Sequence, residues 1–188
     1  MVKTVHVVPH THWDREWFFT TSRAQIYLLK DLKDVINNLE NNVGFNHFIL
    51  DGQASLIADY LKWRPQDLKK VQNLVKNKKL IIGPWYTQTD QFLPSGENIV
   101  RNLLYGMKIC SKLGGYMNIG YVPDSFGQES SMPQIYKGLG IDKAVLWRGF
   151  PNYEATHSEF IWKGEDGSRI NVYRMACGYS VSYTHLRA

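Results

Sequence analysis

The chain of 188 residues carries a formal net charge of +5; 44% of its residues are hydrophobic, 21% are charged and 13% are aromatic. This composition is typical of a folded globular protein and excludes a disordered or collagen-like chain. No apolar run approaches the roughly 18 residues of a membrane-spanning helix, and no stripe of basic and aromatic residues indicates nucleic-acid binding. We therefore expect neither a membrane nor a nucleic acid as a partner.

The N-terminal segment and the cysteines predict where the protein resides. The polar motif PHTHWDREW starts at Pro9 and leaves no room for the apolar core of a signal peptide. Cys110 and Cys177 make neither a disulfide framework nor a CxxC zinc site. We expect a cytoplasmic protein in which both cysteines are buried as small apolar residues.

Short apolar runs rich in β-branched residues alternate with amphipathic stretches that are long enough for helices. In chain order the pattern predicts a strand over 5–8, a helix over 23–39, a strand over 45–50, helices over 54–62 and 66–77, a strand over 80–82, a helix over 95–113, a strand over 119–122, a helix over 133–139 and a strand over 143–147. Two further strands, 160–163 and 169–175, flank Glu165-Asp166-Gly167-Ser168, where Asp-Gly indicates a hairpin turn. The βαβ alternation predicts an α/β fold with a mostly parallel sheet.

Polar residues gather directly after each predicted strand. They are His10, His12 and Asp14 after the first, Asp51 after the second, Trp85 and Asp90 after the third, Asp124 after the fourth and Arg148 after the fifth. Because the carboxyl ends of parallel strands meet at one edge of a sheet, we expect a functional site at this edge.

His12 and Asp14 are two residues apart, so in extended backbone their side chains point to the same side. One nitrogen and one oxygen ligand suit zinc or a similar divalent ion. A hydrogen-bonded His-Asp pair that only holds a loop is the alternative. His10 shares the same side but lies closer to the strand, so we expect it to have a supporting or packing role.

Asp124 lies in the motif GYVPDSFGQ, where Pro123 makes the backbone rigid and Gly127 permits a turn. The spacing alone leaves three roles open for this carboxylate, namely a nucleophile, a metal ligand or a helix cap. Tryptophan and tyrosine side chains near such acids often bind sugar rings, although most tryptophans belong to a core.

Five segments in this order resemble the N-terminal catalytic region of glycoside hydrolase family 38, the zinc-dependent retaining α-mannosidases. They are PHTHWDREWFFT, LDGQ, IIGPWYTQTDQFLPSGENIVRNLLYG, YVPDSFGQ and LWRGF. The resemblance covers roughly residues 4–180 and is greatest to the bacterial cytoplasmic branch that includes mannosylglycerate hydrolase. It implies an incomplete (β/α)7-type barrel as the fold.

The resemblance also implies roles for individual residues. His12 and Asp14 would be zinc ligands, and Asp124 would be both a zinc ligand and the catalytic nucleophile. Residues near the sugar would be Trp17, Asp90, Arg148 and Tyr179. The implied substrate is a small α-mannoside such as mannosylglycerate; its identity and phosphorylation stay open, as does the oligomeric state of a full-length parent, a homo-oligomer included.

The matching motifs lack two functional residues of the family, a fourth zinc ligand and the general acid. The resemblance implies that the fourth zinc ligand, a histidine, and the general acid, an aspartate, lie further along. The downstream histidines His157 and His185 stand in no matching motif. We therefore expect residues 1–180 to be an incomplete, inactive N-terminal part of the catalytic domain. Residues 181–188 equal the translation of a DNA sequence that resembles a sequencing adapter, and we expect them to be non-native.

Two other functions stay open at this point. One is a zinc-dependent polysaccharide deacetylase, whose related barrel also places Asp and His around a metal. The other is a non-catalytic carbohydrate-binding module.

Overall fold

The computed structural model describes residues 7–151 and 157–179, which divide into two compact units. Unit 1 is formed by residues up to 87 together with 105–117, and unit 2 by residues 88–104 together with those from 118 onward. The predicted non-native segment 181–188 and the first half of the predicted strand 5–8 lie outside the described residues.

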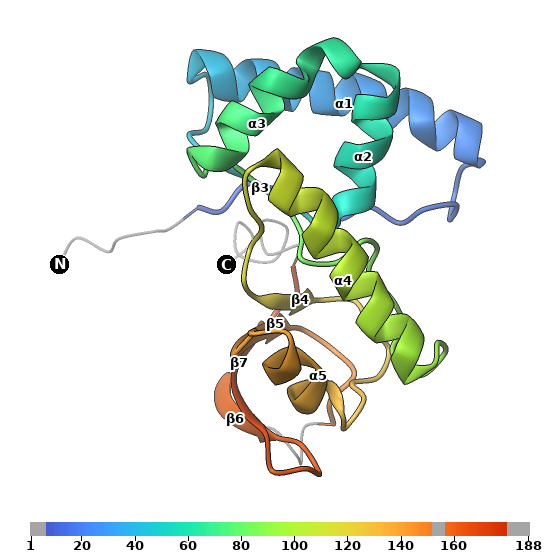
Figure 1. Cartoon of the computed structure of the whole chain (residues 1–188), viewed down its shortest axis with the longest axis vertical. Helices are drawn as coiled ribbons and strands as arrows, with labels where there is room; N and C mark the ends of the chain where they lie inside the picture. Colours follow the sequence, from blue (N-terminus) through green and yellow to red (C-terminus); the bar gives the residue numbers. More distant parts are fainter. Residues whose placement is uncertain (1–6, 152–156, 180–188) are drawn as a thin grey trace, which may run out of the picture. The chain divides into compact units, whose positions relative to one another are not determined.

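Unit 1 contains a three-stranded parallel sheet with the order β1-β2-β3. Its strands are β1 (His10–Thr11), β2 (Phe48–Leu50) and β3 (Leu80–Ile81). The connections carry α1 (Thr21–Asn41), α2 (Ala54–Trp63), the 3-10 helix η1 (Pro65–Asp67) and α3 (Leu68–Lys76) (Figure 1). Parallel neighbours require such crossovers, because a tight turn can join only antiparallel strands.

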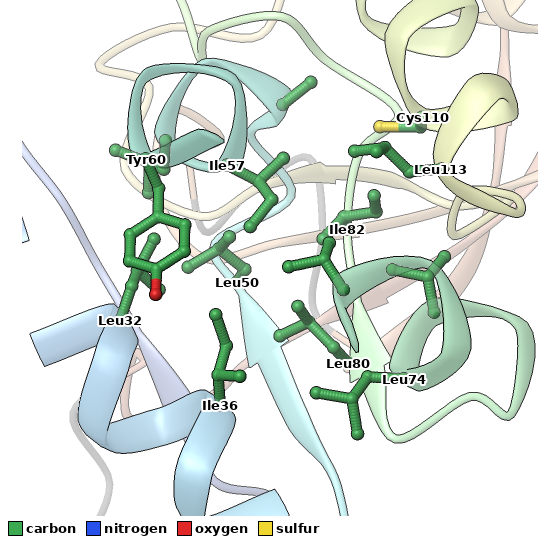
Figure 2. Close-up of a cluster of buried hydrophobic side chains, with 14 of the residues drawn as sticks. Leu32, Ile36, Leu50, Ile57, Tyr60, Leu74, Leu80, Ile82, Cys110 and Leu113 are labelled. Carbon is green, nitrogen blue, oxygen red and sulfur yellow. The ribbon is translucent and has the colours of Figure 1, made fainter. Parts of the chain in front are cut away.

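The core of unit 1 lies between these helices and the sheet. The buried residues of α1 are Leu28, Leu32, Ile36 and Leu39, spaced so that they form one face of the helix. Figure 2 shows Leu32 and Ile36 together with Leu50 of β2 and Leu80 of β3 in the same cluster. The amphipathic spacing in the sequence is thus the direct cause of this packing.

Unit 2 contains a four-stranded sheet with the order β4-β5-β7-β6. Its strands are β4 (Gly120–Val122), β5 (Lys143–Leu146), β6 (Glu159–Lys163) and β7 (Arg169–Arg174), and α5 (Met132–Gly138) joins β4 to β5. All pairs are parallel except β6–β7, which form the predicted hairpin. In its turn the Asp166 carboxylate accepts hydrogen bonds from the Ser168 backbone and hydroxyl, and Gly167 has a φ of 87°.

The α/β class and the mostly parallel pairing are confirmed. Within the described residues the strands form two sheets and no closed barrel, in agreement with an incomplete one. The remaining long helix, α4 (Gly96–Leu113), confirms the prediction over 95–113. No helix of the described part is long and apolar enough to cross a membrane.

Two expectations are wrong. Val7 and Val8 are exposed and outside any strand. The strand β1 starts at His10, because its pairing with β2 begins at the hydrogen bond from the Ile49 N–H to the Pro9 carbonyl. Cys110 is buried on α4 as expected, but Cys177 is exposed because it lies in a turn after β7.

Candidate active site

His12 follows β1 and lies between two carboxylates of unit 1. Its Nδ1 is 3.1 Å from Asp51 Oδ1, and its Nε2 is 3.4 Å from Asp14 Oδ1. The structure therefore brings together the predicted pair His12 and Asp14 and adds a third residue, Asp51. His10 is half-buried within β1, where it pairs with Ile49.

Asp51 is the residue that sequence reasoning left without a role. It is fully buried directly after β2, with a φ of 45°. Its Oδ2 accepts hydrogen bonds from the Trp13 backbone N–H at 2.8 Å and from Gln53 Nε2 at 2.6 Å. The available signal was the motif LDGQ, in which an acid stands between an apolar strand and a glycine. In the structure this glycine, Gly52, also has a positive φ.

The donor set around His12 fits a divalent cation. When Nδ1 donates to Asp51, the Nε2 lone pair faces the Asp14 carboxylate, and two acceptors at 3.4 Å repel each other unless a proton or cation lies with them. Two ligands at about 2.0–2.2 Å from a tetrahedral zinc ion are about 3.4 Å apart. Imidazole nitrogen with carboxylate oxygen is also a donor set that zinc accepts.

In unit 2, Asp124 follows β4 and is paired with Arg148, which follows β5. The Arg148 Nη2 is 2.5 Å from Asp124 Oδ1, and its Nε donates to the Asp124 carbonyl at 3.2 Å. The guanidinium lies over the ring of Phe126, 4.0 Å from its centroid. The helix-cap role left open for Asp124 is wrong, because the N-cap of the next helix, α5, is Ser131.

A buried glutamine ties the loop after Asp124 to the rest of unit 2. Gln91 accepts a hydrogen bond from the Glu129 N–H at 2.8 Å and donates to Gln128 Oε1 at 3.0 Å. Gln128 in turn donates to the Arg148 carbonyl at 3.0 Å. Gln91 and Gln128 therefore brace the segment that carries Asp124, and no local sequence pattern indicated this.

The other residues implied to lie near the sugar are found in both units. In unit 1, Trp17 is 68% exposed and its ring stacks on Phe18. In unit 2, Asp90 Oδ1 is 3.4 Å from the Ser125 hydroxyl, and Tyr179 packs edge-on against Trp147 at 5.5 Å. Their roles in sugar binding stay predictions.

Comparison with known proteins shows the family of this chain. Residues 2–185 match the family described as Glycosyl hydrolases family 38 N-terminal domain, and the chain belongs to this family. A protein of Halalkalibacterium halodurans named "Putative mannosylglycerate hydrolase" is 38% identical over 96% of this chain and 21% of its own length. An α-mannosidase of Saccharomyces cerevisiae is 32% identical over 90% of this chain and 16% of its own length.

Among solved structures, an α-mannosidase from Enterococcus faecalis V583 superimposes with a TM-score of 0.86 and is 36% identical. The match covers 92% of this chain and 20% of that structure. The chain thus spans about a sixth to a fifth of the length of these relatives.

Proposed function

We propose that this chain forms part of a zinc-dependent retaining α-mannosidase in which Asp124 is the nucleophile. The observation that carries the proposal is the pairing of the Asp124 carboxylate with Arg148 at 2.5 Å at the end of β4, in a chain that belongs to family 38. A carboxylate held in this way has its charge balanced and its orientation restricted before substrate arrives.

The proposed zinc ligands are His12, Asp14 and Asp124. Within unit 1 the 3.4 Å separation of His12 Nε2 from Asp14 Oδ1 supports the first two, and the family resemblance supports the third. A zinc ion held by these residues would supply a positive charge that orients the sugar and stabilises the charge that develops during the reaction.

The chemistry proposed for Asp124 is a double displacement. One carboxylate oxygen forms a bond to the anomeric carbon while the bond from that carbon to the leaving oxygen breaks. The leaving oxygen takes a proton from a second carboxyl group, which the family resemblance puts outside these 188 residues. Water then cleaves the glycosyl ester and returns Asp124 to its carboxylate form.

The side chains proposed to contact the sugar are Trp17, Asp90, Arg148 and Tyr179. An exposed tryptophan face such as that of Trp17 is available to a sugar ring. The proposed substrates are small α-mannosides such as mannosylglycerate, the compound for which the Halalkalibacterium relative is named.

Trapping the covalent intermediate on the parent protein tests this function. A fluorinated mannosyl fluoride that forms a slowly hydrolysed glycosyl enzyme should add its sugar mass to the peptide that contains Asp124. The Asp124→Asn variant should stay unlabelled, and a chelator should abolish hydrolysis of an aryl α-mannoside. A deacetylase or a non-catalytic sugar-binding module would give no labelled peptide, and labelling of another carboxylate would remove Asp124 as the nucleophile.

A further inference from the structure

We propose that Asp51 is a positioning residue that determines which nitrogen of His12 carries the proton. By accepting a hydrogen bond from Nδ1–H, Asp51 leaves the lone pair of His12 on Nε2, facing Asp14. The inference rests on the proposed zinc site for its function, but the tautomer itself is a property of the metal-free chain.

The Asp51 carboxylate is held on its other oxygen. Oδ2 accepts hydrogen bonds from the Trp13 N–H and from Gln53 Nε2, at 2.8 and 2.6 Å. The Gln53 amide is itself oriented, because its Oε1 accepts a hydrogen bond from the Thr87 hydroxyl at 3.0 Å and its Nε2 also donates to the Trp13 carbonyl at 3.1 Å. Asp51 is fully buried, so its carboxylate is fixed by these contacts.

The fixed carboxylate presents Oδ1 to His12 Nδ1 at 3.1 Å. Both imidazole nitrogens face a carboxylate, which only accepts hydrogen bonds. The Nδ1 contact to buried Asp51 is the shorter one, at 3.1 Å against 3.4 Å for Nε2 and the exposed Asp14, so a neutral His12 places its proton on Nδ1. The basic nitrogen is then Nε2, which lies 3.4 Å from Asp14 Oδ1. A carboxylate behind a metal-binding histidine is a common arrangement, because it orients the ring and increases the basicity of the ligating nitrogen.

The Asp51→Asn variant separates this role from simple packing, because it keeps the size and shape of the side chain. The Oδ2 position faces two donors, Trp13 N–H and Gln53 Nε2, so the new amide must place its oxygen there. Its NH2 group then faces His12 and donates to Nδ1. The proton of the imidazole moves to Nε2, and the nitrogen that faces Asp14 must lose this proton before it can bind a cation.

The first measurement is the tautomer of His12 in the metal-free chain, read from long-range proton–nitrogen spectra at a pH where histidine is neutral. The chain has 6 histidines, and a His12→Gln variant assigns the signal. We expect Nδ1–H in the wild type and Nε2–H in Asp51→Asn. The exposed Asp34→Asn on α1, which removes the same charge elsewhere in unit 1, should keep Nδ1–H. If His12 of the wild-type chain carries its proton on Nε2, the proposal is wrong whatever the variants show.

The second measurement is the zinc dissociation constant, obtained by competition with a chromophoric chelator. Loss of a carboxylate behind a histidine ligand typically weakens metal binding about 10- to 100-fold, and we expect this for Asp51→Asn and no change for Asp34→Asn. If zinc binds and Asp51→Asn alters neither the affinity nor the tautomer, the role of Asp51 is wrong while the zinc site stands. If the tautomer changes as expected but no chain binds zinc, the zinc site is wrong and the control of His12 by Asp51 stands.

Discussion

At the scale of single residues, a buried tyrosine joins α2 to the start of α3. The Tyr60 hydroxyl donates to Asp67 Oδ2 at 2.7 Å, and Arg64 Nε lies 3.3 Å from the same oxygen. Burial, followed by the hydrogen bond to Asp67, raises the pKa of Tyr60 well above its ordinary value. Burial opposes the Asp67 charge, but the hydrogen bonds from Tyr60 and Arg64 and the charges of Arg64 and Lys70 outweigh it, so the pKa of Asp67 is lowered.

Removal of this hydroxyl should destabilise the protein in a pH-dependent way. We expect Tyr60→Phe to lower the free energy of unfolding by about 1–3 kcal/mol at neutral pH, because the buried Asp67 loses a donor. Because the pKa of Asp67 is lower in the folded state than in the unfolded state, its ionised form stabilises the folded protein. This stability is fully present above the unfolded-state pKa of about 3.9 and is lost as the pH falls through the folded-state pKa. Urea unfolding at pH 7 and at several values below 4 should therefore show a smaller loss of stability on acidification in Tyr60→Phe than in wild type.

The half-exposed Tyr105 on α4 provides the control for this substitution. Tyr105→Phe should unfold like the wild type at every pH. If the free energy of unfolding fell with pH by the same amount in wild type and in Tyr60→Phe, the hydrogen bond would not lower the pKa of Asp67.

The two cysteines should differ in reactivity. Burial raises the pKa of the Cys110 thiol to about 12, whereas Cys177 is exposed. Because the thiolate is the reactive form, a thiol reagent at pH 8 should label Cys177 rapidly and Cys110 only after unfolding. Mass spectrometry of the folded Cys177→Ser variant checks this, and rapid labelling of that variant would contradict the burial of Cys110.

At the scale of elements, α4 lies against the backbone that follows β3. A Cβ atom on Gly106 would overlap backbone atoms of Pro84, Trp85 and Tyr86, which are part of unit 1 together with Gly106. Gly96, on the first turn of the same helix, has no atom within 4 Å of the corresponding position.

Alanine at these two glycines should therefore have opposite effects. Alanine favours a helix over glycine by about 1 kcal/mol, so Gly96→Ala should be neutral or slightly stabilising. Gly106→Ala should lose about 1–3 kcal/mol, because the helix must move away from the backbone it contacts. Equilibrium urea unfolding of both variants measures the difference, and equal stabilities would mean that α4 does not approach this backbone closely.

At the scale of the whole molecule, a shared zinc ion would link residues that are far apart in the sequence. A ligand that binds only the folded state stabilises it by about 2.7 kcal/mol at 100 times its dissociation constant. If His12, Asp14 and Asp124 bind one ion, zinc should raise the melting temperature of the chain, and either His12→Ala or Asp124→Asn should remove most of that increase. Thermal unfolding with zinc and with a chelator tests this, and Asp34→Asn should keep the full increase.

Asp124 is the decisive position in that comparison. An Asp124→Asn variant that retains the full effect of zinc would remove Asp124 from the ligand set. The ligand role of His12 and Asp14 would then be judged from whether His12→Ala loses the zinc-dependent increase in melting temperature.

The local features of this fold were predictable because they depend on neighbours in the sequence. The apolar spacing in α1 predicts its buried face, and Asp166-Gly167 predicts the β6–β7 hairpin. Likewise, a His-x-Asp pair after a strand predicts that His12 and Asp14 lie side by side.

Only the tertiary structure decided which distant segments meet. The sequence alone did not indicate that β7 pairs with β5 and leaves β6 at the edge of the sheet. Nor did it assign Asp51 to His12, 39 residues away, because a single polar residue after a strand has no periodic pattern. Hydrophobic spacing and turn residues act over a few positions, whereas strand order and the partners of buried polar groups depend on how the whole chain packs.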